Sequence, residues 1–355
     1  MRRVMPFRIG ENRIKPFSRG ERNTASRGKR SVFPPDNGHG FERGVAVLSI
    51  DTECIWGFLD KYDDASFEMH YPNAIVVARR LLALLCQAGL SATWAVVGGL
   101  SLSGSAGPKD PRMSGLPDSW ISPIREGDES NAPLWYARSF VQRIRDSAPT
   151  QDVGLHGGLT HMVWTDPDTP REILCRELQA GIAALGEIGV VPQSFVFPRN
   201  VEGHHQLLAS NGIRAYRGAA PVLSSKLGRT VPGSIMRVVE ELGRFTPPPV
   251  WPEERCPGLW NIPASLFFFR MSKSRTWMVP QATRRQRARL GLEAAARAGA
   301  VFHFWFHPEN LAESETAFSV FESVIEEVVR ARSTADIEVL TMKQVADRME
   351  ERNTA

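Results

Sequence analysis

The sequence predicts an α/β fold in which strands and helices alternate around a barrel. From residue 44 onward, short apolar runs typical of strands alternate with longer helical segments. Four apolar runs end in polar or charged residues: SIDTE at 49–53, GLHGGLTH at 154–161, FVFPRN at 195–200 and FHFWFHPEN at 302–310. In a barrel of parallel strands such ends lie at one rim, where catalytic side chains are placed.

The elements follow in order along the chain. Helix 72–88 has Pro72 in its first turn and Gly89 beyond its end. Two irregular insertions are predicted, at 101–132 and 219–258; the first is far longer than a median connection of about 4–6 residues and would be a lid or a mobile segment. The predicted strands are 45–51, 92–98, 152–156, 194–197, 213–218, 258–265, 301–307 and 336–341. The other predicted helices are 134–146, 170–188, 203–211, 280–298 and 313–332.

The first 43 residues differ in composition from the rest. They hold eleven Lys and Arg against four Asp and Glu, with little apolar periodicity. They carry a charge of +7 in a chain of net +4, so residues 44–355 carry −3. We expect residues 1–43 to be a disordered basic extension and residues 44–355 to form one barrel domain without a nucleic-acid-binding core.

Targeting signals and cysteine usage indicate the cellular compartment in which the protein works. The basic MRR start is followed by no apolar run, which argues against a secretory signal. The most apolar long stretch, 74–100, contains Arg79, Arg80 and Gln87 and is too polar to span a bilayer. The four cysteines form no CxxC pair, as expected of reduced thiols. We therefore expect a cytoplasmic protein, with its oligomeric state left open.

The first polar strand end carries two carboxylates on one face. Alternation along the strand places Asp51 and Glu53 on the same side. Carboxylates this close repel unless a proton or a cation lies between them, as with a metal ligand beside a general base. The alternative is that Asp51 caps the next turn and Glu53 is solvated.

The second strand end carries two histidines. His156 and His161 flank Gly157 and Gly158, and neutral imidazole is a common zinc ligand. On a regular helix, positions five apart diverge by about 140°. A left-handed or bulged conformation at the glycines would turn the two rings toward each other; otherwise one histidine is structural.

The last of the four polar strand ends, at 302–310, carries His303 and His307. Alternation places His303, Trp305 and His307 on one face, and Pro308 ends the ladder. His307 would stand at the mouth of the barrel, where a histidine can protonate a leaving amine. His303 would lie a layer deeper, as a hydrogen-bonded core residue.

These segments, in this order, resemble the polysaccharide deacetylases, the NodB-homology family or family 4 of the carbohydrate esterases. The resemblance extends from about Gly44 to near the C-terminus. It implies a distorted (β/α) barrel with fewer than eight regular repeats. It also implies one divalent metal ion, most often zinc, and hydrolysis of acetyl groups from sugars.

The resemblance assigns a role to each matching position. It implies these roles: Asp51 as general base, Glu53, His156 and His161 as metal ligands, and His307 as general acid. Thr52 stands where the family usually has a second Asp, and the two histidines are one residue further apart than usual.

The third motif also departs from the family pattern. Val196 occupies the position of the family's Arg, which orients the general base, and Arg199 follows Pro198 nearby. Arg199 is therefore the candidate to orient Asp51, and a surface ion pair with Glu202 is the alternative.

The resulting hypothesis is a metal-dependent hydrolase that removes an acyl group, most often N-acetyl, from a small sugar or glycan precursor. Carboxylate and free amine would be released. Trp260 and Trp305 are candidate substrate-binding residues, although the sequence favours a buried core position for Trp260. Two alternatives stay open: an amidohydrolase of a non-sugar amide or ring, as in the allantoinase-like branch, and a non-catalytic sugar-binding homologue.

Overall fold

One curled sheet organises the chain. The structure, a computed structural model, describes residues 40–104, 106–222, 231–268, 280–334 and 336–354. The strand order is β6-β7-β5-β4-β3-β2-β1-β9-β8, and β10 also pairs with β1. All pairings are parallel except β6 with β7. The strands are β1 (Gly44–Thr52), β2 (Thr93–Val96), β3 (Asp152–His156), β4 (Ser194–Val196), β5 (Ala215–Arg217), β6 (Glu253–Cys256), β7 (Leu259–Asn261), β8 (Leu266–Phe267), β9 (Val301–Phe306) and β10 (Ile337–Val339).

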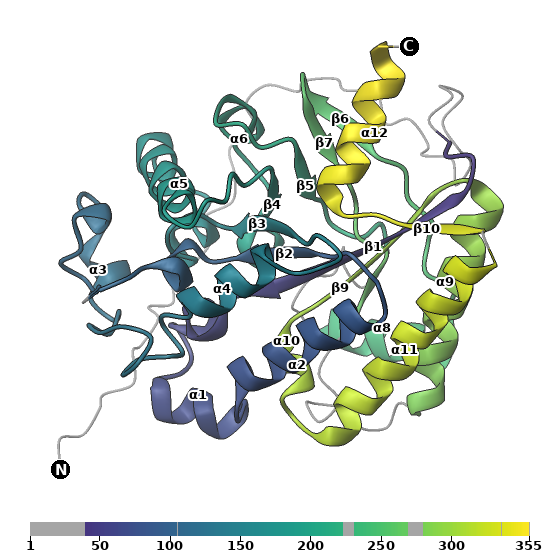
Figure 1. The fold of residues 1–355 in the computed structure, drawn as a ribbon, viewed down its shortest axis with the longest axis horizontal. Helices are drawn as coiled ribbons and strands as arrows, with labels where there is room; N and C mark the ends of the chain where they lie inside the picture. The colour runs from purple at the N-terminus through teal and green to yellow at the C-terminus, as the bar shows by residue number, and fades with distance from the viewer. Residues whose placement is uncertain (1–39, 105, 223–230, 269–279, 335, 355) are drawn as a thin grey trace.

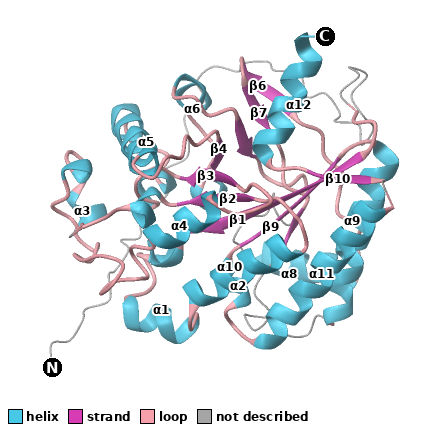
Figure 2. Ribbon diagram, viewed as in Figure 1, coloured by secondary structure: helices cyan, strands magenta, loops and turns pink. Residues whose placement is uncertain are grey.

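Helices surround this sheet (Figures 1 and 2). The helices are α1 (Asp64–His70), α2 (Ala74–Gln87), α3 (Asp118–Ile121), α4 (Arg138–Arg145), α5 (Arg171–Gly186), α6 (His205–Ser210), α8 (Val231–Leu242), α9 (Gln281–Ala298), α10 (Pro308–Leu311), α11 (Glu315–Ser333) and α12 (Met342–Thr354). Because strands and helices alternate around a curled, largely parallel sheet, the predicted α/β barrel-type fold is confirmed. Among the described residues, no helix combines the length and the apolar composition that a membrane span requires.

The two faces of β1 enter two different apolar clusters. Ala46, Leu48 and Ile50 belong to the larger cluster, which also contains buried side chains of α2, α4, α5, α9 and α11. Val45 and Val47 belong to the smaller cluster, together with side chains of β4, β5, β7 and α12. The period-2 alternation of the sequence therefore separates an outer, helix-covered face from an inner face. Asp51 and Glu53 continue the inner series.

Helix α12 closes the amino-terminal end of the sheet. The Met342 N–H donates to Thr93 Oγ1 at the start of β2, and the Lys343 N–H donates to Asp152 Oδ2 at the start of β3. Val345 and Met349 are buried in the inner cluster. The inner face is thereby covered at its amino-terminal end, whereas Asp51 and Glu53 lie at its carboxyl-terminal end.

Several parts of the described chain differ from the sequence-based expectation, among them α1 and β8, which were not predicted. Helix α8 and strand β6 lie within 219–258, which was predicted to be irregular, and α12 was not predicted. The insertion 101–132 packs against the outer cluster through Met113, Leu116 and Ile124. Most of the predicted extension 1–43 lies outside the described residues.

Candidate active site

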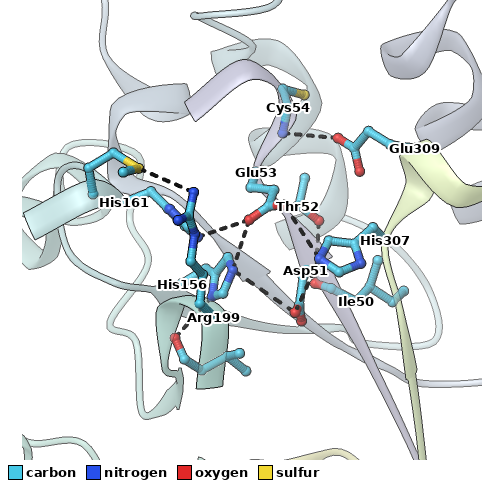
Figure 3. A network of polar contacts seen from close by, with 12 residues as sticks. Ile50, Asp51, Thr52, Glu53, Cys54, His156, His161, Arg199, His307 and Glu309 are labelled. Atoms are coloured by element: carbon cyan, nitrogen blue, oxygen red, sulfur yellow. Dashed lines mark hydrogen bonds and ion pairs between the residues drawn. The ribbon is translucent and has the colours of Figure 1, made fainter. Parts of the chain in front are cut away.

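Five predicted site residues meet at the carboxyl ends of neighbouring strands (Figure 3). Asp51 lies near the end of β1 and Glu53 follows it, His156 ends β3, His161 lies in the next loop, and His307 follows β9. The first four are buried, whereas the His307 side chain is 18% exposed. His307 therefore lies at the mouth of the site, as the alternation predicts.

Glu53, His156 and His161 form a compact ligand set. Their ligand atoms all lie within 4.8 Å of one another. Glu53 Oε2 is 3.1 Å from His156 Nε2 and 3.0 Å from His161 Nε2. Burial alone would raise the pKa of Glu53, but the neighbouring His307 and His161 rings hold it well below its usual value. An ionised carboxylate thus faces two imidazoles.

The hydrogen bonds of the histidines suit a cation between these groups. His156 Nδ1 donates to the Val196 carbonyl oxygen at 3.0 Å, so in the neutral ring the lone pair of Nε2 faces Glu53. Two facing acceptors repel unless a proton or a metal ion lies between them. His161 Nδ1 has no hydrogen-bond partner within the described part of the chain, and its Nε2 faces Glu53 Oε2 at 3.0 Å without the angles of a hydrogen bond. This buried carboxylate and two imidazoles fit a divalent ion of the zinc type.

The glycines after β3 explain how histidines five positions apart converge. Gly157 has φ +79°, in the left-handed region, and turns the chain sharply. A Cβ on Gly158 would lie 2.5 Å from the Glu177 carbonyl oxygen, so only glycine fits against α5 here. The turn brings the rings of His156 and His161 to a centroid distance of 4.9 Å. The extra residue between the histidines is accommodated by the loop.

Asp51 is held by an arginine that sequence analysis missed. Arg217 Nη1 and Nη2 donate to the two Asp51 carboxylate oxygens at 2.6 and 2.7 Å, and Nη1 also donates to Ser49 Oγ at 3.0 Å. Both charged side chains are buried. Burial alone would raise the pKa of Asp51, but Arg217 outweighs it and the pKa is lowered. Asp51 is therefore kept ionised beside the ligand set.

Arg199 does not take the position proposed for it from the sequence. Its Nη2 donates to Asp60 Oδ1 and contacts Met162 Sδ. Arg199 has φ +54° in the 3-10 turn Pro198–Asn200 that follows β4, and its side chain is partly exposed. Arg217 instead pairs in register with Val196 on the neighbouring strand, so its guanidinium comes from β5. The sequence contained one signal for this role: Arg217 is a charged residue at an inward-facing position of the predicted strand 213–218.

The two candidate tryptophans also lie differently from the expectation. Trp260 is 1% exposed in the inner cluster, and its Nε1 donates to Glu350 of α12 at 2.8 Å. It is a core residue at the closed end of the sheet, out of reach of a substrate. Trp305 has the Arg217 guanidinium 4.0 Å from its ring centroid and the Phe267 ring stacked at 4.1 Å. Trp305 therefore supports the Arg217 guanidinium, and its side chain stays partly exposed.

His303, within β9, and His307, just after it, lie at different depths, as the alternation predicts. His303 Nδ1 donates to the Ile262 carbonyl oxygen and Nε2 accepts from Ser49 Oγ; burial and Arg217 lower the pKa of His303 to about 3. It is a neutral core residue. His307 Nδ1 donates to Asn310 Oδ1 at 3.3 Å, which directs Nε2 toward the carboxylates. Nε2 lies 3.4 Å from Glu53 Oε1 and 3.7 Å from Asp51 Oδ2.

Glu177 of α5 holds the histidine loop from the outside. Its carboxylate accepts the Thr160 N–H and, at 2.7 Å, the Trp164 Nε1–H. Burial raises the pKa of Glu177 from 4.5 to about 7. Between these values the folded protein keeps a proton that the unfolded chain has released. We therefore expect Glu177 to lower the free energy of unfolding by about 1.4 kcal/mol for each pH unit as pH rises through this interval.

Urea unfolding at pH 5, 6 and 7 checks this expectation. Glu177→Gln should remove the contribution, so that the difference in unfolding free energy between variant and wild type changes with pH. The exposed Glu187, replaced by Gln, serves as the matched control and should give a difference that is nearly constant. Parallel pH curves for wild type and Glu177→Gln would contradict the assignment.

Comparisons with known proteins find the fold by structure alone. No family model matches the chain, and no curated protein matches its sequence. A protein assigned as a polysaccharide deacetylase from Mycobacterium smegmatis superposes with a TM-score of 0.56 at 18% identity, over 88% of this chain and 92% of that one. Another so assigned, from Pseudomonas aeruginosa PAO1, gives 0.54 at 12% identity, over 85% and 89%.

A third solved structure widens the comparison. PuuE allantoinase superposes with a TM-score of 0.55 at 12% identity, over 90% of this chain and 96% of that one. At these identities the likeness concerns the fold. The chain therefore has the fold of the polysaccharide deacetylases and of this allantoinase, as the resemblance of its motifs predicts.

Proposed function

We propose that this protein is a metal-dependent hydrolase that removes an acyl group, N-acetyl in the first instance, from a sugar or glycan precursor. One observation carries the proposal. A buried carboxylate and two imidazoles converge on one point, next to a second carboxylate held ionised by Arg217 and a histidine at the mouth. This arrangement supplies a ligand set, a base and an acid in one place.

Each side chain has a distinct part in acyl cleavage. A divalent ion held by Glu53, His156 and His161 would supply Lewis acidity at the acyl oxygen. Asp51 accepts a proton from the attacking water as the new C–O bond forms. His307, protonated at Nε2, donates its proton to the nitrogen as the C–N bond breaks. The products are a carboxylate and a free amine, and Arg217 keeps Asp51 in its basic form.

A second candidate is hydrolysis of a non-sugar amide or ring. The observation that favours it is the likeness of fold to PuuE allantoinase, whose TM-score lies between those of the two proteins assigned as deacetylases. The same ligand set, base and acid would serve this reaction. The non-catalytic alternative is less well supported, because a decayed site has no need of a buried ion pair between Asp51 and Arg217.

Metal content tests the proposal first. Purified wild type, dialysed against chelator-free buffer, is expected to hold close to one zinc or similar divalent ion per chain by elemental analysis. His161→Ala should lose it, whereas His70→Ala, which alters a helix-terminal histidine outside the site, should keep it. Wild-type protein without bound metal would contradict the metal-dependent hydrolase mechanism and would favour the non-catalytic, sugar-binding alternative.

Product release then separates the two enzyme candidates. Acetate released from N-acetyl sugars by the loaded wild type supports the deacetylase. Turnover of a cyclic amide such as allantoin, with no acetate from any N-acetyl sugar, would transfer the proposal to the second candidate. His161→Ala is the negative control for both assays.

A further inference from the structure

A buried carboxyl group joins the two strand ends that carry the acid and the ligand. Glu309 lies in α10, two residues after His307, and is 1% exposed. Its Oε1 accepts the backbone N–H of Cys54 at 3.0 Å, across 255 positions of sequence (Figure 3). Cys54 directly follows Glu53. The segment after β9 is thus tied to the chain at the point where β1 ends.

The hydrogen bond from Cys54 to Glu309 is made at a residue with a left-handed backbone conformation. Cys54 has φ +45°, in the left-handed region that L-residues other than glycine rarely adopt. Its buried N–H also needs an acceptor, since an orphaned buried amide costs about as much as a lost hydrogen bond. Glu309 provides that acceptor and so supports the turn that aims the Glu53 side chain at His156 and His161.

A protonated, neutral Glu309 is compatible with its position near two other carboxylates. Burial and the nearby Glu53 carboxylate raise the pKa of Glu309 to about 8. A neutral acid can accept the amide N–H without adding a third negative charge beside Asp51 and Glu53. Glu309 Oε2 has no hydrogen-bond partner among the described residues, whereas Oε1 accepts the Cys54 N–H.

The same short helix orients the acid. Asn310, the next residue, accepts both the His307 backbone N–H at 3.2 Å and the His307 Nδ1–H at 3.3 Å through its Oδ1. One turn of helix therefore controls two groups: Asn310 sets the ring of His307, and Glu309 sets the turn that follows Glu53.

We propose that Glu309 is a positioning residue that holds Glu53 in the orientation needed for metal binding and keeps it in register with His307. The inference rests on the proposed function, because it assumes that Glu53 is a metal ligand. Glu309 is not one of the ligand, base or acid side chains; it acts through the backbone of Cys54.

Zinc affinity, measured by competition with a chelating dye, tests this role without any substrate. Glu309→Ala should weaken zinc binding by about 10–100-fold, the usual cost of removing a group that orients a ligand. Glu309→Gln keeps the acceptor oxygen and the neutral charge, and should bind zinc within about threefold of wild type. Glu327→Ala removes a buried carboxylate that pairs with Arg285 on the outer helices, and should leave zinc affinity unchanged.

Hydrogen exchange of the Cys54 amide gives a readout that needs no metal. The amide should be protected in wild type and in Glu309→Gln, and should exchange faster in Glu309→Ala. Wild-type zinc affinity in Glu309→Ala, or equal loss in the Gln and Ala variants, would overturn the inference while leaving the proposed function intact. Wild type that binds no zinc would instead overturn the proposed function, and this role with it.

Discussion

Replacement of Arg217 by alanine is expected to lower the free energy of unfolding by about 3–5 kcal/mol. The change leaves the Asp51 carboxylate buried without its bidentate partner, and buried charges are costly when unpaired. It also removes the cation that stacks on Trp305. Urea unfolding monitored by tryptophan fluorescence and by circular dichroism measures the loss.

Two further variants make this result specific. Arg217→Lys should recover only part of the stability, because one ammonium group cannot make two parallel hydrogen bonds to a carboxylate. Arg199→Ala removes a partly exposed arginine paired with Asp60 and should cost no more than about 1 kcal/mol. If Arg199→Ala were as damaging as Arg217→Ala, the guanidinium that orients Asp51 would have been misassigned.

Asp51→Asn is expected to reduce the rate of acyl release by about 10²–10⁴-fold while the bound metal is retained. The amide is nearly isosteric with the carboxylate and can still accept one hydrogen bond from Arg217, but it cannot take a proton from water. Glu53, His156 and His161 are unchanged, so the ligand set remains complete. Steady-state acetate release, with zinc measured on the same sample, separates loss of the base from loss of the metal.

The matched control for Asp51→Asn is Asp60→Asn. Asp60 is an exposed aspartate on the loop after β1, and its partner is Arg199. Its replacement should change turnover by less than about threefold, since a surface ion pair contributes little. An Asp51→Asn variant that kept wild-type turnover with a full complement of zinc would remove Asp51 from the mechanism.

Much of the fold was predictable because its signals are local. Strand alternation placed Asp51 with Glu53, and His303 with Trp305 and His307, on shared faces, and the structure agrees. Helix α8 lies in the segment 219–258, which was predicted to be irregular; Pro232 falls in its first turn, where proline is compatible with a helix. Helix α12 was not predicted despite apolar residues at i, i+3, i+4 and i+7, which is a helical spacing.

The site was only partly predictable, and the errors share a cause. Arg199 was chosen because it is close in sequence to the expected motif position, whereas Arg217 reaches Asp51 from the next strand of the sheet. Trp305 was placed on the correct face, but its neighbours Arg217 and Phe267, which cover its ring, come from other strands. Long-range neighbours depend on strand order and register, and local pattern carries neither.

The sequence by itself determined which residues face inward at each strand end, because side-chain direction follows from backbone periodicity. Only the tertiary structure decided which inward residues meet. The pairs Arg217 with Asp51 and Glu309 with Cys54 join segments 166 and 255 positions apart. The curl and order of the sheet bring such segments within hydrogen-bond distance, and burial then makes their charge and hydrogen-bond pairing obligatory.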